Sequence, residues 1–144
     1  MLSVLTFRSG VIFIKEQSYS TFQSQVAGNL FRHSSILDLM TKNNESLSRI
    51  QRAIARAVTE CGCITIHASK QQFPNGNSLA TLPNYSNSHL DGALCDQCLD
   101  VMKNELGNHL FYLSSICNAL KISMDQVIKE ESSRLSTLGV YTLR

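Results

Sequence analysis

Apolar residues recur at intervals of three and four along the C-terminal third of the chain, as on the buried face of an α-helix. They are Leu99, Met102, Leu106, Leu110, Leu113, Cys117 and Leu120. Ser123, with Gln126 three residues later, has the capping-box pattern that starts a second helix. The buried side of that helix would consist of Met124, Val127, Ile128 and Leu135. The pattern predicts a helical hairpin over residues 92–144, with a non-helical tail over residues 136–144.

An earlier helix is predicted from residue 45 to about residue 61. Its apolar face would consist of Leu47, Ile50, Ile54, either Ala57 or Val58, and Cys61. Arg49, Arg52 and Arg56 recur with the same spacing, so they form a basic stripe on this helix. The stripe is either a solvated face or a surface that contacts phosphate groups, which suit the planar donor fork of arginine.

Between these two helical regions the pattern is irregular. Residues 64–66 are β-branched and fit a strand or a helix end equally well. Residues 70–90 contain both prolines and many Asn and Ser residues, so they are expected to form a loop. A loop of this length in a compact domain is usually functional or mobile.

Residues 1–44 show no clean period, although Phe22, Val26 and Leu30 could line one face of a helix. A length of 144 residues favours a single unit with a hydrophobic core. We therefore expect an all-α protein with an N-terminal extension over residues 1–44 and a helical domain over residues 45–144.

Composition narrows the classes of function. Apolar residues make up 43% and charged residues 17% of the chain, as in a globular protein. A net charge of +2 gives no indication of a nucleic-acid or membrane partner. The apolar N-terminus is interrupted by charged residues and is too short to span a membrane, so we expect a short strand or a loosely docked arm there. A cytoplasmic location is expected on the same grounds.

Four of the five cysteines form two close pairs, Cys61 with Cys63 and Cys95 with Cys98. Four thiolates can complete a tetrahedral zinc site, and the second pair has the spacing of a zinc knuckle. A helix that ends near Cys61 and an antiparallel helix that begins near Cys95 would bring the pairs together. The alternatives are reduced thiols without a metal, or a redox or disulfide pair.

Other side chains could modify this zinc site. Either His67 or His89 could replace one thiol as a ligand. Cys117 lies on the apolar face of its helix and is expected to pack in the core.

Glu105 and Asn108 are three residues apart and therefore share a helix face with Tyr112. This face continues into apolar residues, so a carboxylate there needs a metal, an arginine or a hydrogen-bond donor as partner. The alternative is an exposed glutamate and an exposed asparagine without a site.

Two stretches resemble a known enzyme family. The sequence Asn-Glu-Leu-Gly-Asn-His-Leu-Phe-Tyr-Leu at residues 104–113, followed by residues 117–124, resembles the third helix and turn of the MazG-like nucleoside triphosphate pyrophosphohydrolases. Residues 52–63 look like the preceding helix of that family. The resemblance covers roughly residues 46–66 and 92–135, and the Ser-Thr-Leu-Gly sequence at residues 136–139 is similar to a cysteine-bearing bacterial branch.

The resemblance implies a MazG-like helical bundle, a homo-oligomer and magnesium-dependent hydrolysis of a nucleotide. In the family's metal motif the leading glutamates fall on Thr59 and Glu60, and the third falls on Cys63. The paired acids of the next helix fall on Glu105 and Asn108. Only two carboxylates of the pattern remain, and a cysteine favours zinc over magnesium.

Two functions follow from these residues. If the protein is an enzyme, Glu60, Glu105 and Asn108 would hold a divalent cation, and the arginine stripe would contact nucleotide phosphates. If it is not, the cysteines would stabilise a helical module for interaction or regulation. The region of Cys61 and Cys63 can join Cys95 and Cys98 in a zinc site or face Glu105 in a carboxylate site. It cannot easily do both, because Glu105 lies about 15 Å along its helix from Cys95. The sequence favours the zinc arrangement, since it uses all four cysteines.

Overall fold

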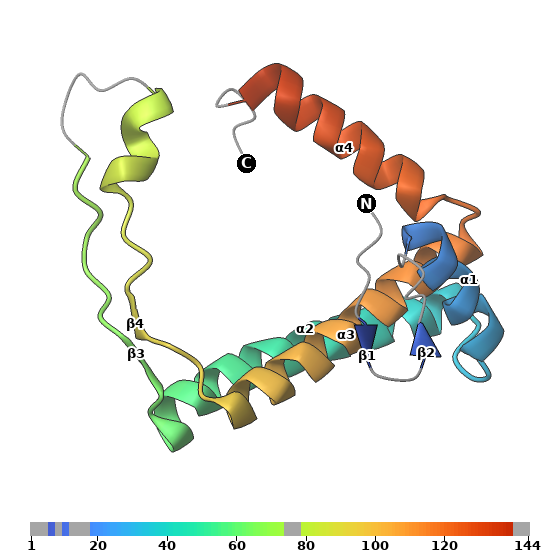
Figure 1. Cartoon of the computed structure of the whole chain (residues 1–144), viewed down its shortest axis with the longest axis horizontal. Coiled ribbons are helices and arrows are strands. Elements are labelled where there is room, and N and C mark those ends of the chain that lie inside the picture. The colour runs from blue at the N-terminus through green and yellow to red at the C-terminus, as the bar shows by residue number, and fades with distance from the viewer. Residues whose placement is uncertain (1–5, 8–9, 12–17, 74–78, 140–144) are drawn as a thin grey trace.

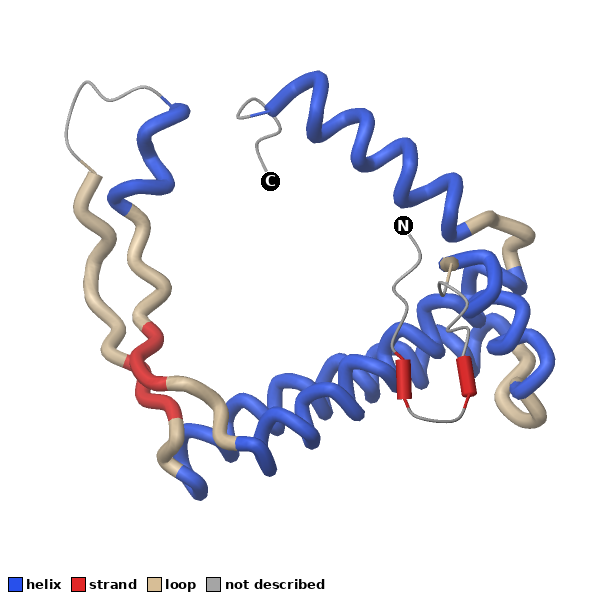
Figure 2. The backbone as a smooth tube through the Cα atoms, in the orientation of Figure 1, coloured by secondary structure: helices blue, strands red, loops and turns tan. Residues whose placement is uncertain are grey.

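The structure is a computed structural model that describes residues 6–7, 10–11, 18–73 and 79–139. Its elements are β1 (Thr6–Phe7), β2 (Gly10–Val11), α1 (Tyr19–Asn29), α2 (Ile36–Arg56), the π-helical turn η1 (Ala57–Cys61), β3 (Ile64–Ile66), the 3₁₀ helix η2 (Leu79–Tyr85), β4 (Leu90–Gly92), α3 (Asp96–Ala119) and α4 (Met124–Leu138). The fold is all-α, as expected, and strand is confined to two short ribbons within the described residues (Figure 2).

Helices α2 and α3 run antiparallel, side by side, and form the central layer (Figure 1). The β3–β4 ribbon and the described residues between its strands extend from one end of this layer (Figure 1), and we call residues 62–73 and 79–94 the arm. Helices α1 and α4 lie at the other end, where α4 packs against α1 and diverges from α3 (Figure 1). The predicted helical hairpin is therefore open. None of the described helices is long and apolar enough to cross a membrane.

Helix α2 begins at Ile36 rather than at residue 45, so the expected boundary after residue 44 falls inside a helix. Leu39 is completely buried, and Ser35 holds the extended conformation of an N-cap residue. The asparagines at positions 43 and 44 have low helix propensity and interrupt the apolar pattern. Tertiary packing of Leu39 outweighs that local preference.

Helix α1, within the expected N-terminal extension, is tied to the helical body. Ser18 caps it by accepting a hydrogen bond from the backbone N–H of Thr21 at 3.2 Å. The side-chain amide of Gln23 donates to the carbonyl of Ile122 at 2.7 Å, and its oxygen accepts from the N–H of Met124 at 2.9 Å. These bonds join α1 to the turn between α3 and α4. Before Ser18, only the paired strands β1 and β2 are described, and the rest of the expected N-terminal arm lies outside the described residues.

The hairpin's second helix starts as predicted but ends later. The Ser123 hydroxyl caps α4 by accepting from the N–H of Gln126 at 3.3 Å. Helix α4 continues to Leu138, so the tail predicted from residue 136 is wrong over its first residues. Residues 140–144 lie outside the described part of the chain.

The predicted apolar face of α3 is not buried against α2. Leu106 and Leu110 remain 45% and 47% exposed, whereas Ser114 and Ser115 are completely buried. The small side chains of Ser46 and Ala57 line the buried side of α2 and η1. Small residues let the two helix axes approach closely, so α3 packs through a polar side and leaves its leucines uncovered.

Candidate metal centre

Two cysteine pairs meet at the end of the α2–α3 layer where the arm begins. Cys61 is the last residue of η1, and Cys63 follows one residue later. Cys95 is the N-cap residue of α3, and Cys98 lies in the first turn of that helix. The four sulfur atoms all lie within 4.8 Å of one another. The structure therefore brings together all four cysteines that the sequence selected, and they can hold a metal ion.

The spacing of the sulfurs suits a tetrahedral thiolate site. The Sγ atoms of Cys61 and Cys95 are 3.7 Å apart. A tetrahedron with metal–sulfur bonds of about 2.3 Å has sulfur–sulfur edges of about 3.8 Å. A disulfide bond, in contrast, would require about 2.05 Å. All the cysteines are free thiols, so the donor set fits a metal ion better than an oxidised pair.

Local backbone conformation turns the chain back between Cys61 and Cys63. Gly62 has a left-handed φ of 70°, which favours glycine and ends the helix. The π-helical turn before it places one extra residue in the last turn of the helix, a distortion frequent at functional sites. Cys63 points its thiol at the carbonyl of Ala57, at 3.8 Å.

The β3–β4 ribbon brings the second pair to the first. Its strands are antiparallel, and Ile64 pairs with Gly92. A Cβ on Gly92 would lie 2.6 Å from the carbonyl oxygen of Cys63, so this close approach requires a glycine. The residues predicted to form either a strand or a helix end are thus a strand. Helix η2 occupies part of the predicted loop.

Protonation differs among the thiols. The backbone amide of Cys98, with smaller contributions from the neighbouring thiols, lowers the pKa of Cys95 to about 7. The Cys95 and Cys61 side chains raise the pKa of Cys98 to about 12. Thiols held this close do not ionise together without a cation between them. A metal ion supplies that positive charge and replaces their protons.

The two histidines that could have replaced a thiol lie outside the cluster. Among the described residues, the four-cysteine group is the one cluster of three or more potential metal ligands. His67 is highly exposed and faces Asp91, with 3.8 Å between Nε2 and Oδ2. Neither this histidine nor His89 belongs to the cluster. Cys117 lies outside the cluster and is partly buried, and burial raises the pKa of its thiol.

Glu60 and Glu105, two of the three residues expected to hold a divalent cation, line the same groove between α2 and α3. Glu60 pairs with Arg56, with 2.8 Å between its Oε2 and the arginine Nε. Asn108 lines a separate small cavity, together with Tyr112. The sequence left two positions open for residues 61–63, one beside Cys95 and Cys98 and one facing Glu105. In the structure, the sulfurs of Cys61 and Cys63 lie beside those of Cys95 and Cys98.

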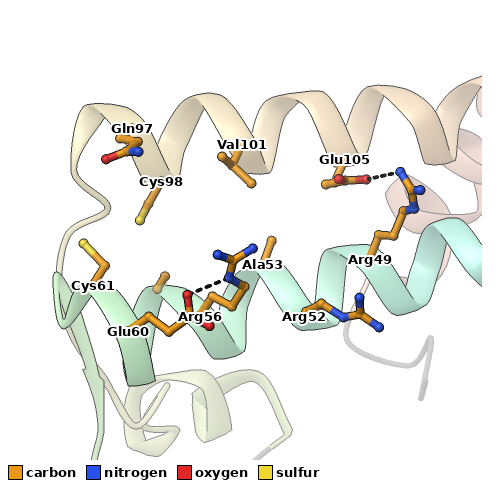
Figure 3. A pocket seen from close by; sticks show the side chains of 11 residues that line it. Arg49, Arg52, Ala53, Arg56, Glu60, Cys61, Gln97, Cys98, Val101 and Glu105 are labelled. Carbon is orange, nitrogen blue, oxygen red and sulfur yellow. Dashed lines mark hydrogen bonds and ion pairs between the residues drawn. The ribbon is translucent and has the colours of Figure 1, made fainter.

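A groove of about 490 Å³ lies between α2 and α3, next to the cysteines (Figure 3). Its lining residues include Arg49, Arg52, Arg56, Glu60, Cys61, Cys98 and Glu105. We call it the arginine groove. All three arginines of the predicted stripe therefore line one cavity, with Glu105 on its opposite wall (Figure 3).

Three features of the site were not found from the sequence. They are the π-helical turn, the close approach at Gly92, and a hydrogen bond of 2.9 Å between Ser46 and His109 that links α2 to α3. The glycine between two cysteines at position 62 was the available signal for a tight turn. The other two depend on contacts between distant segments, which periodicity does not show.

Comparisons with protein-family models, with curated proteins and with solved structures found no match to this chain.

Proposed function

We propose that this protein is a zinc-stabilised, all-α module of MazG-like architecture that acts through binding rather than catalysis. The observation that carries the proposal is the cluster of four cysteine sulfurs, with its 3.7 Å edge between Cys61 and Cys95. Thiolates are soft ligands that select zinc over magnesium, and a site closed by four protein ligands is structural rather than catalytic.

The zinc ion would fix the arm to the helical layer. Cys61 and Cys63 flank the start of the arm, and Cys95 and Cys98 follow its end. One ion would therefore hold both ends of the arm at the junction of η1 and α3. The free energy of zinc binding would then contribute to the stability of this junction.

A second copy of the chain would cover the exposed apolar residues of the layer. The chain exposes 11474 Å², whereas a compact monomer of 16.0 kDa exposes about 7400 Å². The difference between these two areas is the excess exposed surface of one chain. If each of two chains buried a quarter of its excess against the other, the interface would measure roughly 2000 Å² in total, the size of a stable dimer. We define the apolar face as the following side chains, all at least 37% exposed: Leu47, Ile54, Leu99, Leu106, Leu110 and Leu113.

The apolar face and the arginine groove lie on different sides of the layer. Neighbouring helix positions are about 100° apart, so Leu106 lies about 100° around α3 from Glu105. By the same geometry, Leu47 lies about 140° around α2 from Arg52. A second copy on the apolar face would therefore leave the arginine groove open.

Hydrolysis of a nucleoside triphosphate to a monophosphate and pyrophosphate is the second candidate function. It is favoured by the arginine groove and by Glu105, whose Oε2 is buried without a hydrogen-bond partner. Against it, Glu60 is paired with Arg56 and Asn108 lines another cavity, so the oxygen ligands that magnesium needs are dispersed.

Metal analysis of protein purified without a histidine tag tests the proposal. We expect one zinc per chain, lost in Cys63→Ser and retained in the control Cys117→Ser, because Cys117 lies outside the cluster. A nucleotide panel with magnesium should give no release of pyrophosphate. Zinc-free wild-type protein would overturn the zinc proposal, and magnesium-dependent release that disappears in Glu105→Ala would establish the enzyme.

A further inference from the structure

The arginine groove contains two groups that the described residues do not satisfy. Arg52 forms no hydrogen bond or ion pair with the described part of the chain. On the opposite wall, Oε2 of Glu105 is buried and accepts no hydrogen bond. The nearest cation to that oxygen is Arg49, whose Nη1 is 3.9 Å away and therefore too far for a hydrogen bond.

The buried oxygen of Glu105 differs from an ordinary surface charge, whereas Arg52 is exposed to solvent. A buried carboxylate oxygen without a donor is unfavourable, because it has lost its water without gaining a partner. Arg52 lines the same groove and presents a planar fork of donors. The groove volume of about 490 Å³ lies in the range that holds small organic ligands. A ligand that brings both an anionic group and a hydrogen-bond donor would satisfy both walls.

Charge falls unevenly along the groove, which directs the anionic group of a ligand. With zinc bound as proposed above, four thiolates and the ion carry a net charge of about −2 at the Cys61 and Cys98 end. Arg56 is already paired with Glu60 near that end. Arg52 lies about 13 Å along the helix from Cys61. Arg49 is shared with Glu45, with 3.5 Å between Nε and Oε1, so Arg52 carries the unpaired positive charge at this end of the groove, and an anion is favoured there.

We propose that the arginine groove binds a phosphomonoester that also carries an N–H or O–H donor. The phosphate lies on Arg52 and Arg49, and the donor reaches Oε2 of Glu105. A phosphomonoester suits this place because its oxygens match the arginine fork, its charge is attracted to both arginines, and its N–H or O–H donor compensates for the nearby carboxylate of Glu105. Binding needs no magnesium, since the groove carries its own positive charge. The position of the phosphate along the groove rests on the proposed zinc ion. The unpaired Arg52 and the buried oxygen of Glu105 are observed without it.

Calorimetric titration of the zinc-loaded full chain at pH 8, without magnesium, tests this site. The probes are adenosine monophosphate, ribose 5-phosphate and sulfate, which is an anion without a donor. The variants are Arg52→Gln, Glu105→Leu and the control Arg134→Gln, because Arg134 lies on α4 and pairs with Glu131 outside the groove. Zinc content and circular dichroism of each variant report whether it is folded.

We expect at least one phosphomonoester to bind more tightly than sulfate. Arg52→Gln should lower the affinity for all anions about tenfold. Glu105→Leu should lower the affinity for the phosphomonoesters about tenfold and leave the affinity for sulfate undiminished. Binding of adenosine monophosphate alone identifies a donor on the base, and binding of both probes identifies a sugar hydroxyl. Arg134→Gln should change nothing.

Three results would overturn the proposal: no binding by zinc-loaded protein, sulfate binding as tight as that of the phosphomonoesters, or binding that Arg52→Gln leaves unchanged. Failure of the zinc proposal is recognised separately, because it appears as absent metal whether or not the phosphomonoesters bind.

Discussion

Gly92 lies so close to the backbone of Cys63 that a Cβ at position 92 would come within 2.6 Å of the Cys63 carbonyl oxygen. The contact is between backbone atoms, so no side chain can move away to relieve it. Gly92 also has φ of 88°, a conformation that residues with a side chain rarely adopt. This glycine therefore sets the distance between β4 and the cysteine that immediately precedes β3.

Gly92→Ala should displace β4 from Cys63 and weaken the metal centre. We expect a substoichiometric zinc content and a lower melting temperature, because the clash and the positive φ together cost more than 1 kcal/mol. Zinc analysis and thermal denaturation measure both effects.

Gly107→Ala is the matched control for that substitution. Gly107 lies inside α3, and a Cβ there would meet nothing within 4 Å. Its replacement should keep the zinc and raise stability by up to about 1 kcal/mol, because alanine is the better helix former. Equal zinc content and equal stability in both variants would show that the approach at Gly92 does not shape the centre.

Local periodicity predicted α3, α4 and the second part of α2 but not the start of α2, and pair spacing predicted the cysteine cluster. The cluster could be found in this way because each pair is local and the helices that carry them are antiparallel. The sides of the helices that face each other could not be found. Serines at positions 114 and 115 are buried, whereas Leu110 is exposed, and this reversal depends on how closely α2 and α3 approach.

The carboxylate site shows a different limit. Spacing placed Glu105 and Asn108 on one helix face, but spacing cannot show which cavity each residue lines. In the structure Glu105 lines the arginine groove, and Asn108 lines its neighbour. The ion pair between Glu60 and Arg56, in contrast, could have been predicted from the sequence, because residues four apart on a helix commonly form ion pairs.

Removal of zinc should release the arm and leave the helical layer folded. β3 contacts mainly β4 and η1, and an isolated two-stranded ribbon is marginally stable in water. After chelation we expect hydrogen exchange to accelerate in residues 64–67 and 89–92. Exchange in the middle of α2 and α3 should change little. Unchanged protection of the arm in protein shown to be free of metal would contradict this role of the ion.

Leu110→Lys should dissociate the proposed dimer. Leu110 belongs to the apolar face and is 47% exposed in the single chain. A buried lysine without a partner is strongly unfavourable, so the variant should be monomeric at concentrations where the wild type is dimeric. Size-exclusion chromatography with light scattering measures the mass of each.

Asn104→Lys provides the control for that experiment. Asn104 is an exposed residue of the same helix, about 160° around α3 from Leu106. The added charge there should leave the dimer intact. A wild-type protein that is monomeric at tens of micromolar, or a dimer that Leu110→Lys leaves unchanged, would refute the second copy as the partner of the apolar face.

The hydrogen bond between Ser46 and His109 should contribute to the packing of α2 on α3. The Ser46 hydroxyl donates its single hydrogen to the carbonyl of Asn43 at 2.7 Å, so it accepts from Nδ1–H of His109 at 2.9 Å. Ser46 is only 2% exposed. Ser46→Ala would leave the histidine N–H without an acceptor and should lower the free energy of unfolding by about 1–2 kcal/mol.

Ser48→Ala is the control, because the Ser48 hydroxyl is exposed and bonds only within α2, to the carbonyl of Asn44 at 3.1 Å. Its effect should stay within about 0.5 kcal/mol. Urea denaturation of zinc-loaded protein compares the two variants, and equal midpoints would mean that this bond adds nothing to the contact between the helices.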